Sequence, residues 1–232
     1  MDLVILDLDD TLIDFATTRR IAYEQIGQLM TREGLDAVAY LKACTEVDRP
    51  LFAQFERGEL TRAAYRLRRF SDPFERIGMA PPPGLVEAVN RVFMDCVNDS
   101  PQVHADALPM LQALRALGVR TAILTNGPSD GQRRKLRATG LDKEVDHVAI
   151  GEEIGASKPL ARAFAHVVDR FGLKPAQALM VGDSPELDHD AALEAGLAAW
   201  LLDRPGTHRH GARTCIESLH EVAPRLRPEG GG

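Results

Sequence analysis

Three carboxylates stand within four positions near the start of the chain, on Asp7, Asp9 and Asp10, directly after an apolar run at residues 3–6. Carboxylates this close together repel one another unless a cation lies among them. A hard cation that prefers oxygen ligands, most simply Mg²⁺, would suit such a cluster. An aspartate-rich turn or helix start uses the same residue type. From these residues alone, a metal site and a turn are equally well supported.

Other polar side chains follow apolar runs elsewhere in the chain, at points where a strand would end. They are Thr125 and Asn126 after residues 119–124, Lys158 in a loop after residues 145–150, and Asp183 and Asp188 after residues 178–181. Carboxylate, hydroxyl and ammonium groups at several independent strand ends are hard to explain as ordinary polar surface residues. We therefore expect these groups to form one site.

The elements that must position this site are strands and helices that alternate from residue 101 onward. The expected strands are residues 119–125, 145–150, 178–181 and 197–202. Strand and helix pairs of about 30 residues predict βαβ units and a parallel sheet. Residues 3–6 are apolar at every position, which predicts one more strand, buried on both faces. Ligands bind such sheets at the carboxyl ends of the strands, where the polar groups gather.

A different pattern occupies residues 17–98, where the helical period dominates and strand-like runs are absent. This pattern predicts a small helical bundle inserted after the first strand. We expect Pro50 and Pro73 to separate helices, because proline lacks the amide hydrogen that a helix interior needs.

Three arginines in this region, Arg62, Arg66 and Arg69, share one face of an expected helix. That face lies opposite the apolar stripe of the same helix. A basic wall for an anionic substrate would use this arrangement. We interpret it instead as a solvated helix face, which is the commoner use of such charges.

The composition limits the classes of partner and of compartment. The net charge of −6 argues against a nucleic acid polymer or an anionic membrane as a partner. No apolar run approaches the roughly 18 residues of a membrane span, and no signal peptide is visible. The three cysteines are widely spaced without a CxxC pair, which predicts reduced thiols in a cytoplasmic protein. The sequence does not specify the oligomeric state.

Four segments together resemble a known superfamily. Residues 7–12 (DLDDTL), 124–127 (LTNG), 157–159 (SKP) and 182–188 (GDSPELD) match, in order, the four motifs of the haloacid dehalogenase superfamily of hydrolases. The helical region between the first two motifs looks like the helical C1-type cap of that superfamily. More narrowly, residues 55–61 and 68–70 resemble the pyrimidine 5′-nucleotidase branch.

The resemblance implies an α/β fold with two domains. A Rossmann-like three-layer core with a parallel sheet would comprise residues 1–14 and 101–232, and residues 15–100 would form the helical-bundle cap. It also implies a cytoplasmic, Mg²⁺-dependent phosphatase that hydrolyses a small phosphorylated metabolite through an aspartyl-phosphate. That phosphomonoester could be a nucleoside 5′-monophosphate. The cap loops would set the specificity, so the sequence does not identify the substrate.

The resemblance also implies roles for the carboxylates. Asp7 would attack phosphorus, and Asp9 would protonate the leaving oxygen and later activate water. The Mg²⁺ ligands would be the Asp7 side chain, the Asp9 backbone carbonyl and Asp183. Thr11 would hydrogen-bond Asp9 or the adjacent loop. Asp188 would contact the metal ligands without binding the ion, or would bind it occasionally.

The remaining motif residues would bind the phosphate. The Thr125 hydroxyl and the Asn126 backbone N–H would contact phosphate oxygens, and Lys158 would neutralise the charge between nucleophile and phosphate. Asp10 stands where many members of the superfamily have glycine, and the sequence does not show what this aspartate changes.

Other functions on the same fold remain open. Members of the superfamily that release halide lack an acid two residues after the nucleophile, so the presence of Asp9 favours phosphate esters over a 2-haloacid dehalogenase. A phosphosugar mutase would pass the phosphoryl group to a second substrate instead of water. A non-catalytic binding module is disfavoured, because binding alone does not need Asp9.

Overall fold

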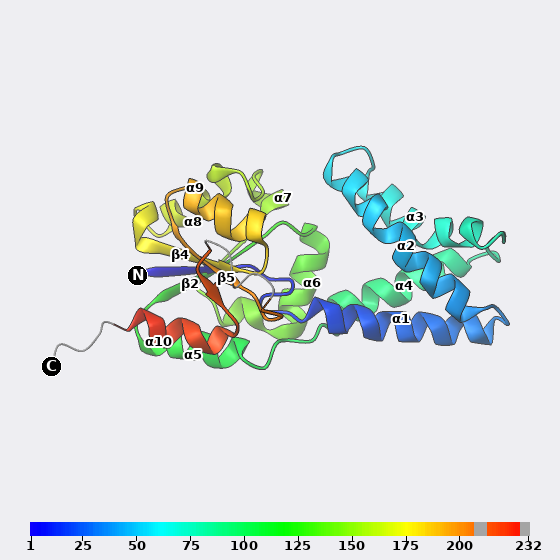
Figure 1. Cartoon of the computed structure of the whole chain (residues 1–232), viewed down its shortest axis with the longest axis horizontal. Coiled ribbons are helices and arrows are strands. Elements are labelled where there is room, and N and C mark those ends of the chain that lie inside the picture. Colours follow the sequence, from blue (N-terminus) through cyan, green and yellow to red (C-terminus); the bar gives the residue numbers. More distant parts are fainter. Residues whose placement is uncertain (207–212, 228–232) are drawn as a thin grey trace. The chain divides into compact units, whose positions relative to one another are not determined.

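The computed structural model describes residues 1–206 and 213–227 and divides into two compact units. The first unit, called the core here, combines Met1–Phe15 with Pro101–Gly232, and the second, called the cap, is Ala16–Ser100. Figure 1 shows the core as a sheet with helices on its faces and the cap as a group of helices. Among the described residues, each helix is too short or too polar to span a membrane.

The core is built on one six-stranded sheet whose strands all run parallel. In chain order the strands are β1 (Leu3–Leu6), β2 (Arg120–Thr125), β3 (His147–Ile150), β4 (Ala178–Gly182), β5 (Ala198–Leu202) and β6 (Cys215–Ile216). Their order across the sheet is β3-β2-β1-β4-β5-β6. The predicted α/β fold with a parallel sheet is confirmed, and β6 is a strand that the sequence pattern did not predict.

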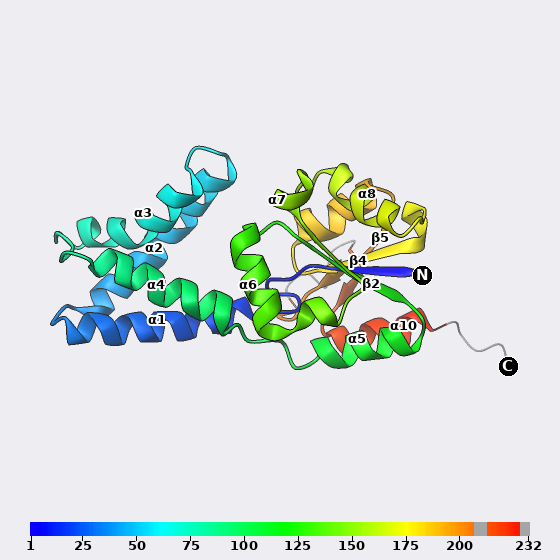
Figure 2. The same ribbon diagram turned by 180° about the vertical axis from the view of Figure 1, so that it is seen from behind.

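Helices cover both faces of this sheet because β1 is apolar on both sides. Val4 and Leu6 pack on one face, and Leu3 and Ile5 pack on the other. The first face carries α5 (Ala107–Ala116), α6 (Ser129–Thr139), η1 (Leu141–Lys143), η4 (Leu219–Glu221) and α10 (Val222–Leu226). The second carries α7 (Gly151–Ile154), α8 (Ala161–Arg170) and α9 (Ala191–Glu194), and Figure 2 shows α8 and α10 on opposite sides. The predicted three layers are therefore present.

The strand order reverses around β1, which creates the switch point where parallel sheets bind ligands. Leu6 is in register with Ile123 of β2 and Val181 of β4. The backbone N–H of Asp7 donates to the Val181 carbonyl at 3.0 Å. The residues that follow β1, β2 and β4 are thereby brought to one edge of the sheet. Two short helices, η2 (Pro175–Gln177) and η3 (Pro185–Asp190), flank β4.

The cap contains four long helices. They are α1 (Phe15–Arg32), α2 (Ala37–Glu56), α3 (Arg62–Arg76) and α4 (Leu85–Asp99). Side-chain caps mark where two of them begin, since Asp36 accepts a hydrogen bond from the Ala39 N–H and Thr61 accepts one from the Ala64 N–H. The predicted absence of strands in this region is confirmed.

Two predictions about helix ends in the cap are wrong. Pro50 lies inside α2 and Pro73 lies inside α3, so neither proline separates helices. An interior proline costs a helix about 3 kcal/mol. Leu51 and Phe74, each next to a proline, are 4% and 0% exposed. Burial of each such side chain contributes about 1.5–3 kcal/mol, which offsets the cost.

The prediction of a solvated face is wrong for Arg69, which is only 8% exposed. Its guanidinium carbon lies 4.1 Å from the ring centre of Phe93 and 4.8 Å from that of Phe70. Burial lowers the pKa of the guanidinium. The electron-rich ring faces hold this cation inside the bundle, an interaction that charge spacing alone does not reveal.

Candidate active site

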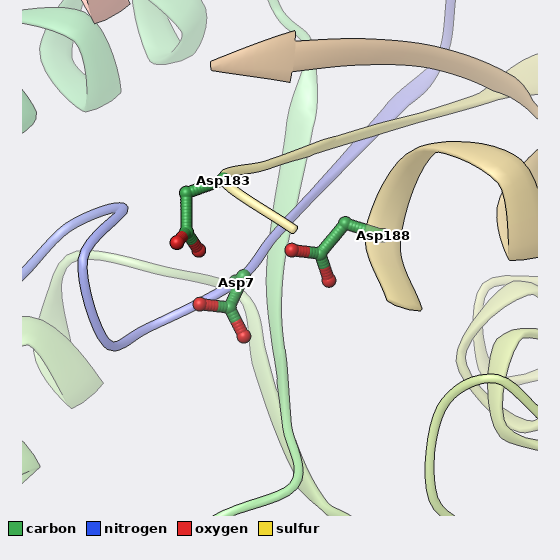
Figure 3. Close-up of side chains that lie close together, drawn as sticks. All are labelled: Asp7, Asp183 and Asp188. Atoms are coloured by element: carbon green, nitrogen blue, oxygen red, sulfur yellow. The ribbon is translucent and has the colours of Figure 1, made fainter. Parts of the chain in front are cut away.

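The ends of β1 and β4 bring three carboxylates together, as Figure 3 shows. One oxygen each of Asp7, Asp183 and Asp188 lies within 4.8 Å of the other two. Asp7 follows β1 directly, Asp183 follows β4 directly, and Asp188 comes from the single π-helical turn η3. We call these three residues the carboxylate cluster.

Lys158 supplies the positive charge of the carboxylate cluster. Its Nζ lies 2.6 Å from Asp7 Oδ1 and 2.5 Å from Asp188 Oδ1. Burial disfavours the ammonium form of Lys158, which is 4% exposed, but the two carboxylates outweigh burial and raise its pKa. The lysine therefore stays charged beside Asp7.

The loop that carries Lys158 is fixed by the side chain of Asn126. Asn126 Nδ2 donates to the Lys158 carbonyl at 2.7 Å, and the Lys158 N–H donates to Asn126 Oδ1 at 2.8 Å. Two hydrogen bonds from one amide hold the backbone on both sides of Lys158 Cα. The structure thus gives the Asn126 side chain a positioning function that the sequence motif did not show.

The cluster is crowded enough to perturb its own protonation. Desolvation raises the pKa of Asp7 well above its ordinary value, and the charges of Asp188 and Asp183 add to this effect. Desolvation, followed by repulsion from Asp188 and Asp10, raises the pKa of Asp183 to about 6. Three carboxylates thus share one ammonium group.

A divalent cation fits this cluster because it would balance that excess of negative charge. Lys158 occupies one oxygen each of Asp7 and Asp188, and Asp188 also accepts from the Ser184 N–H at 3.0 Å. Asp7 and Asp183 are therefore the residues best placed to offer oxygen ligands. This agrees with the roles predicted from the sequence, in which Asp183 binds the ion and Asp188 contacts the ligands. Both roles stay predictions.

Gly182 is required by the packing of the carboxylate cluster. A Cβ atom built on Gly182 would lie 2.2 Å from Asp188 Oδ2. Any larger residue at the end of β4 would displace the Asp188 carboxylate, and with it a partner of Lys158. Gly182 is thus explained by the Asp188 side chain, which packs against its Cα, and not by an unusual backbone angle.

Asp9 lies in a second polar group, formed with helix α6. Lys135 Nζ is 2.5 Å from Asp9 Oδ1, and Gln132 Nε2 is 2.9 Å from Asp9 Oδ2. Gln132 Nε2 also lies 2.7 Å from the hydroxyl oxygen of Thr125. Neither Gln132 nor Lys135 was predicted from the sequence. The available signal was two polar residues, three positions apart, on the same helical face as the apolar Leu136.

The structure shows the surroundings of two further residues of the first motif. The Thr11 hydroxyl lies 3.4 Å from Asp183 Oδ1, so it faces the carboxylate cluster and not Asp9 as one alternative had it. Asp10 has φ 60°, in the left-handed region. Glycine adopts this region freely and aspartate tolerates it, which explains why the position accommodates either residue.

The comparisons with known proteins decide the family. A family model for haloacid dehalogenase-like hydrolases matches residues 1–196. The chain belongs to the haloacid dehalogenase-like hydrolases. This confirms the resemblance inferred from the four motifs and the prediction that the protein is an enzyme.

Two named relatives narrow the class of hydrolase. The chain is 32% identical to a phosphoserine phosphatase of Thermus thermophilus, with 88% of this chain and 89% of that protein covered. It is 28% identical to the pyrimidine 5′-nucleotidase YjjG of Escherichia coli, with 97% of each covered. These relatives support an enzyme of the phosphoric monoester hydrolase type. The fold is similar to that of the HAD-hydrolase YfnB of Bacillus subtilis, with a TM-score of 0.76, 23% identity and 97% and 98% of the two chains covered.

Proposed function

We propose that this haloacid dehalogenase-like hydrolase is a cytoplasmic, Mg²⁺-dependent phosphatase for a small phosphomonoester. A carboxylate oxygen of Asp7 attacks phosphorus, the bond from phosphorus to the ester oxygen breaks, and Asp9 gives its proton to the departing alkoxide. A water molecule then transfers a proton to Asp9 and attacks the aspartyl-phosphate. The products are the alcohol, inorganic phosphate and the restored Asp7 carboxylate.

The other residues of the site serve these two steps. The Thr125 hydroxyl and the Asn126 N–H donate to phosphate oxygens, and Lys158 holds Asp7 while neutralising part of the charge. Asp7, Asp183 and the Asp9 carbonyl would hold Mg²⁺. The metal ion would supply charge stabilisation for the phosphoryl oxygens.

The observation that carries this proposal is the pairing of the two carboxylates after β1 with different partners. Asp7 contacts Lys158 in the carboxylate cluster, whereas Asp9 is linked through Gln132 to Thr125. A nucleophile that attacks carbon and expels halide needs no second acid, and a binding module needs neither. The arrangement therefore favours phosphoryl transfer over dehalogenation and over binding alone.

The substrate is best sought among small phosphate esters. The named relatives act, by their names, on phosphoserine and on pyrimidine nucleotides. We propose a nucleoside 5′-monophosphate as the first substrate to test, because the E. coli relative matches over 97% of both chains.

A phosphate-release screen tests the proposal. The purified protein is incubated with nucleoside 5′-monophosphates, phosphoserine, sugar phosphates and p-nitrophenyl phosphate, with Mg²⁺ or with EDTA. We expect Mg²⁺-dependent release of phosphate from at least one ester. Halide release from 2-chloropropionate without phosphatase activity would overturn the proposal in favour of a dehalogenase, and phosphoryl transfer to a second sugar instead of water would indicate a mutase.

A further inference from the structure

Two buried residues of α6 surround the side chain of Asp9. Lys135 is 5% exposed and Gln132 is 1% exposed, and each contacts a different oxygen of the Asp9 carboxylate. The Asp9 side chain is 31% exposed. Asp9 is thus fixed from the α6 side and open on another.

The burial of Lys135 indicates a specific task. An ammonium group loses its hydration on burial, which is unfavourable unless a carboxylate and other favourable contacts replace the water. Lys135 Nζ has Asp9 Oδ1 at 2.5 Å, and it lies 4.9 Å from the ring centre of Phe15. An ordinary surface lysine would have no need of this arrangement. Its position is explained by the carboxylate that it holds.

Gln132 connects Asp9 to the expected phosphate-binding hydroxyl. An amide nitrogen carries two hydrogens, and Gln132 Nε2 contacts Asp9 Oδ2 at 2.9 Å and Thr125 Oγ1 at 2.7 Å. Because the Thr125 oxygen accepts from Gln132, its own O–H is left to donate in another direction. A phosphate oxygen is an acceptor that suits this O–H.

The glycine of the second motif makes the contact possible. A Cβ atom on Gly127 would lie 2.3 Å from Gln132 Nε2. The Gln132 amide therefore crosses the Cα of Gly127 to reach Asp9. Two sequence features, Gly127 and Gln132, are thus parts of one arrangement.

We propose that Lys135 and Gln132 are positioning residues of the hydrolysis, a role that rests on the proposed function. Lys135 and Gln132 fix the Asp9 carboxyl group where it meets the ester oxygen, and Gln132 also turns the Thr125 hydroxyl toward the phosphate. Neither residue touches the reacting atoms. Replacing them lowers the rate because Asp9 and Thr125 are then no longer held in position.

The test uses the dependence of the reaction on the leaving group. The variants are Lys135→Met, Gln132→Met and the charge-retaining Lys135→Arg, with Lys143→Met as a control at an exposed lysine. For each, kcat/KM is measured with p-nitrophenyl phosphate and with an alkyl phosphate that the wild-type protein hydrolyses. The nitrophenolate leaves without a proton, whereas the alkoxide needs the proton of Asp9.

For Lys135→Met we expect kcat/KM to fall about 10- to 100-fold with the alkyl ester and much less with the aryl ester. Lys135→Arg should recover part of the loss, and Lys143→Met should lose nothing. Gln132→Met should lose activity on both esters, because Thr125 binds phosphate in both, with the larger loss on the alkyl ester.

A general structural effect would lower kcat/KM equally for the two esters, and that result in folded variants would overturn the proposal. A gain in activity on removing Lys135 would also overturn it, since Asp9 would then be restrained from acting. If Lys135→Met does not fold, Lys135→Arg and Gln132→Met decide by the same ratio. A wild-type protein inactive on both esters would instead refute the proposed function itself.

Discussion

The core buries two lysines, and each contacts one of the two aspartates that follow β1. Lys158 contacts Asp7 and also Asp188, while Lys135 contacts Asp9 and faces the ring of Phe15. The first lysine lies among three carboxylates gathered by two strands, and the second is carried by a single helix.

This difference matches the different tasks that we propose for the two aspartates. A nucleophile must be held rigidly, and Asp7 is buried and lies within the carboxylate cluster. A general acid must also reach the leaving group and then water, and Asp9 keeps part of its carboxylate exposed. An aspartate–lysine pair thus buries the carboxylate at Asp7, whereas the second such pair orients the carboxylate at Asp9.

The largest effect that would test this contrast is the loss of the nucleophile. Asp7→Asn should lower phosphate release by about 10⁴-fold or more, because no aspartyl-phosphate can form. The variant should stay folded, since Asp188 still accepts from Lys158. Turnover with p-nitrophenyl phosphate and circular dichroism check both points, with the exposed Asp169→Asn as control. Substantial remaining turnover would remove Asp7 from its assigned role.

A smaller effect is expected when Asp9 is changed. Asp9→Asn should lower the rate about 10²–10⁴-fold, the usual contribution of a general acid and base. With p-nitrophenyl phosphate the first step needs no acid, whereas water attack on the aspartyl-phosphate still needs the base. Mass spectrometry should therefore detect one added phosphoryl group on Asp9→Asn and none on Asp7→Asn. Equal behaviour of the two variants would show that the two aspartates do not divide the work in this way.

The contrast also explains which parts of the site could be predicted. Asp7 and Asp183 directly follow β1 and β4, Thr125 ends β2, and Lys158 lies in the loop between α7 and α8. Parallel strands bring their carboxyl ends to one edge of the sheet, so the residues at these ends could be expected to meet there. Lys135 reaches the site from the interior of a helix, where neither a turn nor a strand end marks it. Its packing depends on how α6 lies on the sheet, which only the structure shows.

The fold was predictable to a similar extent. The alternation of strands and helices specifies the parallel sheet, but β6 is two residues long and has no detectable period. In the cap, helix content was predictable, whereas Pro50 and Pro73 were misplaced because tertiary packing overrides local helix preference. Buried Arg69 was misassigned for the same reason, since the ring nearest to its guanidinium, that of Phe93, belongs to another helix of the cap.

The smallest expected effect is on the pH dependence of stability. We expect this dependence to come from the carboxylate cluster and not from Asp9. The pKa of Asp183 is raised from 3.8 to about 6, chiefly by desolvation. The folded protein then binds more protons than the unfolded chain between these values, so stability is lost as pH rises from about 4 to about 6. A shift of this size corresponds to roughly 3 kcal/mol.

Thermal unfolding in EDTA should therefore show wild-type Tm falling, relative to Asp183→Asn, between pH 4.5 and pH 7. Asp9→Asn should leave that fall in place, because Asp9 is not a member of the cluster, and exposed Asp169→Asn serves as control. Mg²⁺ should raise the wild-type Tm more at pH 7 than at pH 4.5, because protonated carboxyl groups bind the ion poorly. A Mg²⁺ effect of equal size at both pH values, or one that Asp183→Asn retains in full, would place the ion outside the carboxylate cluster.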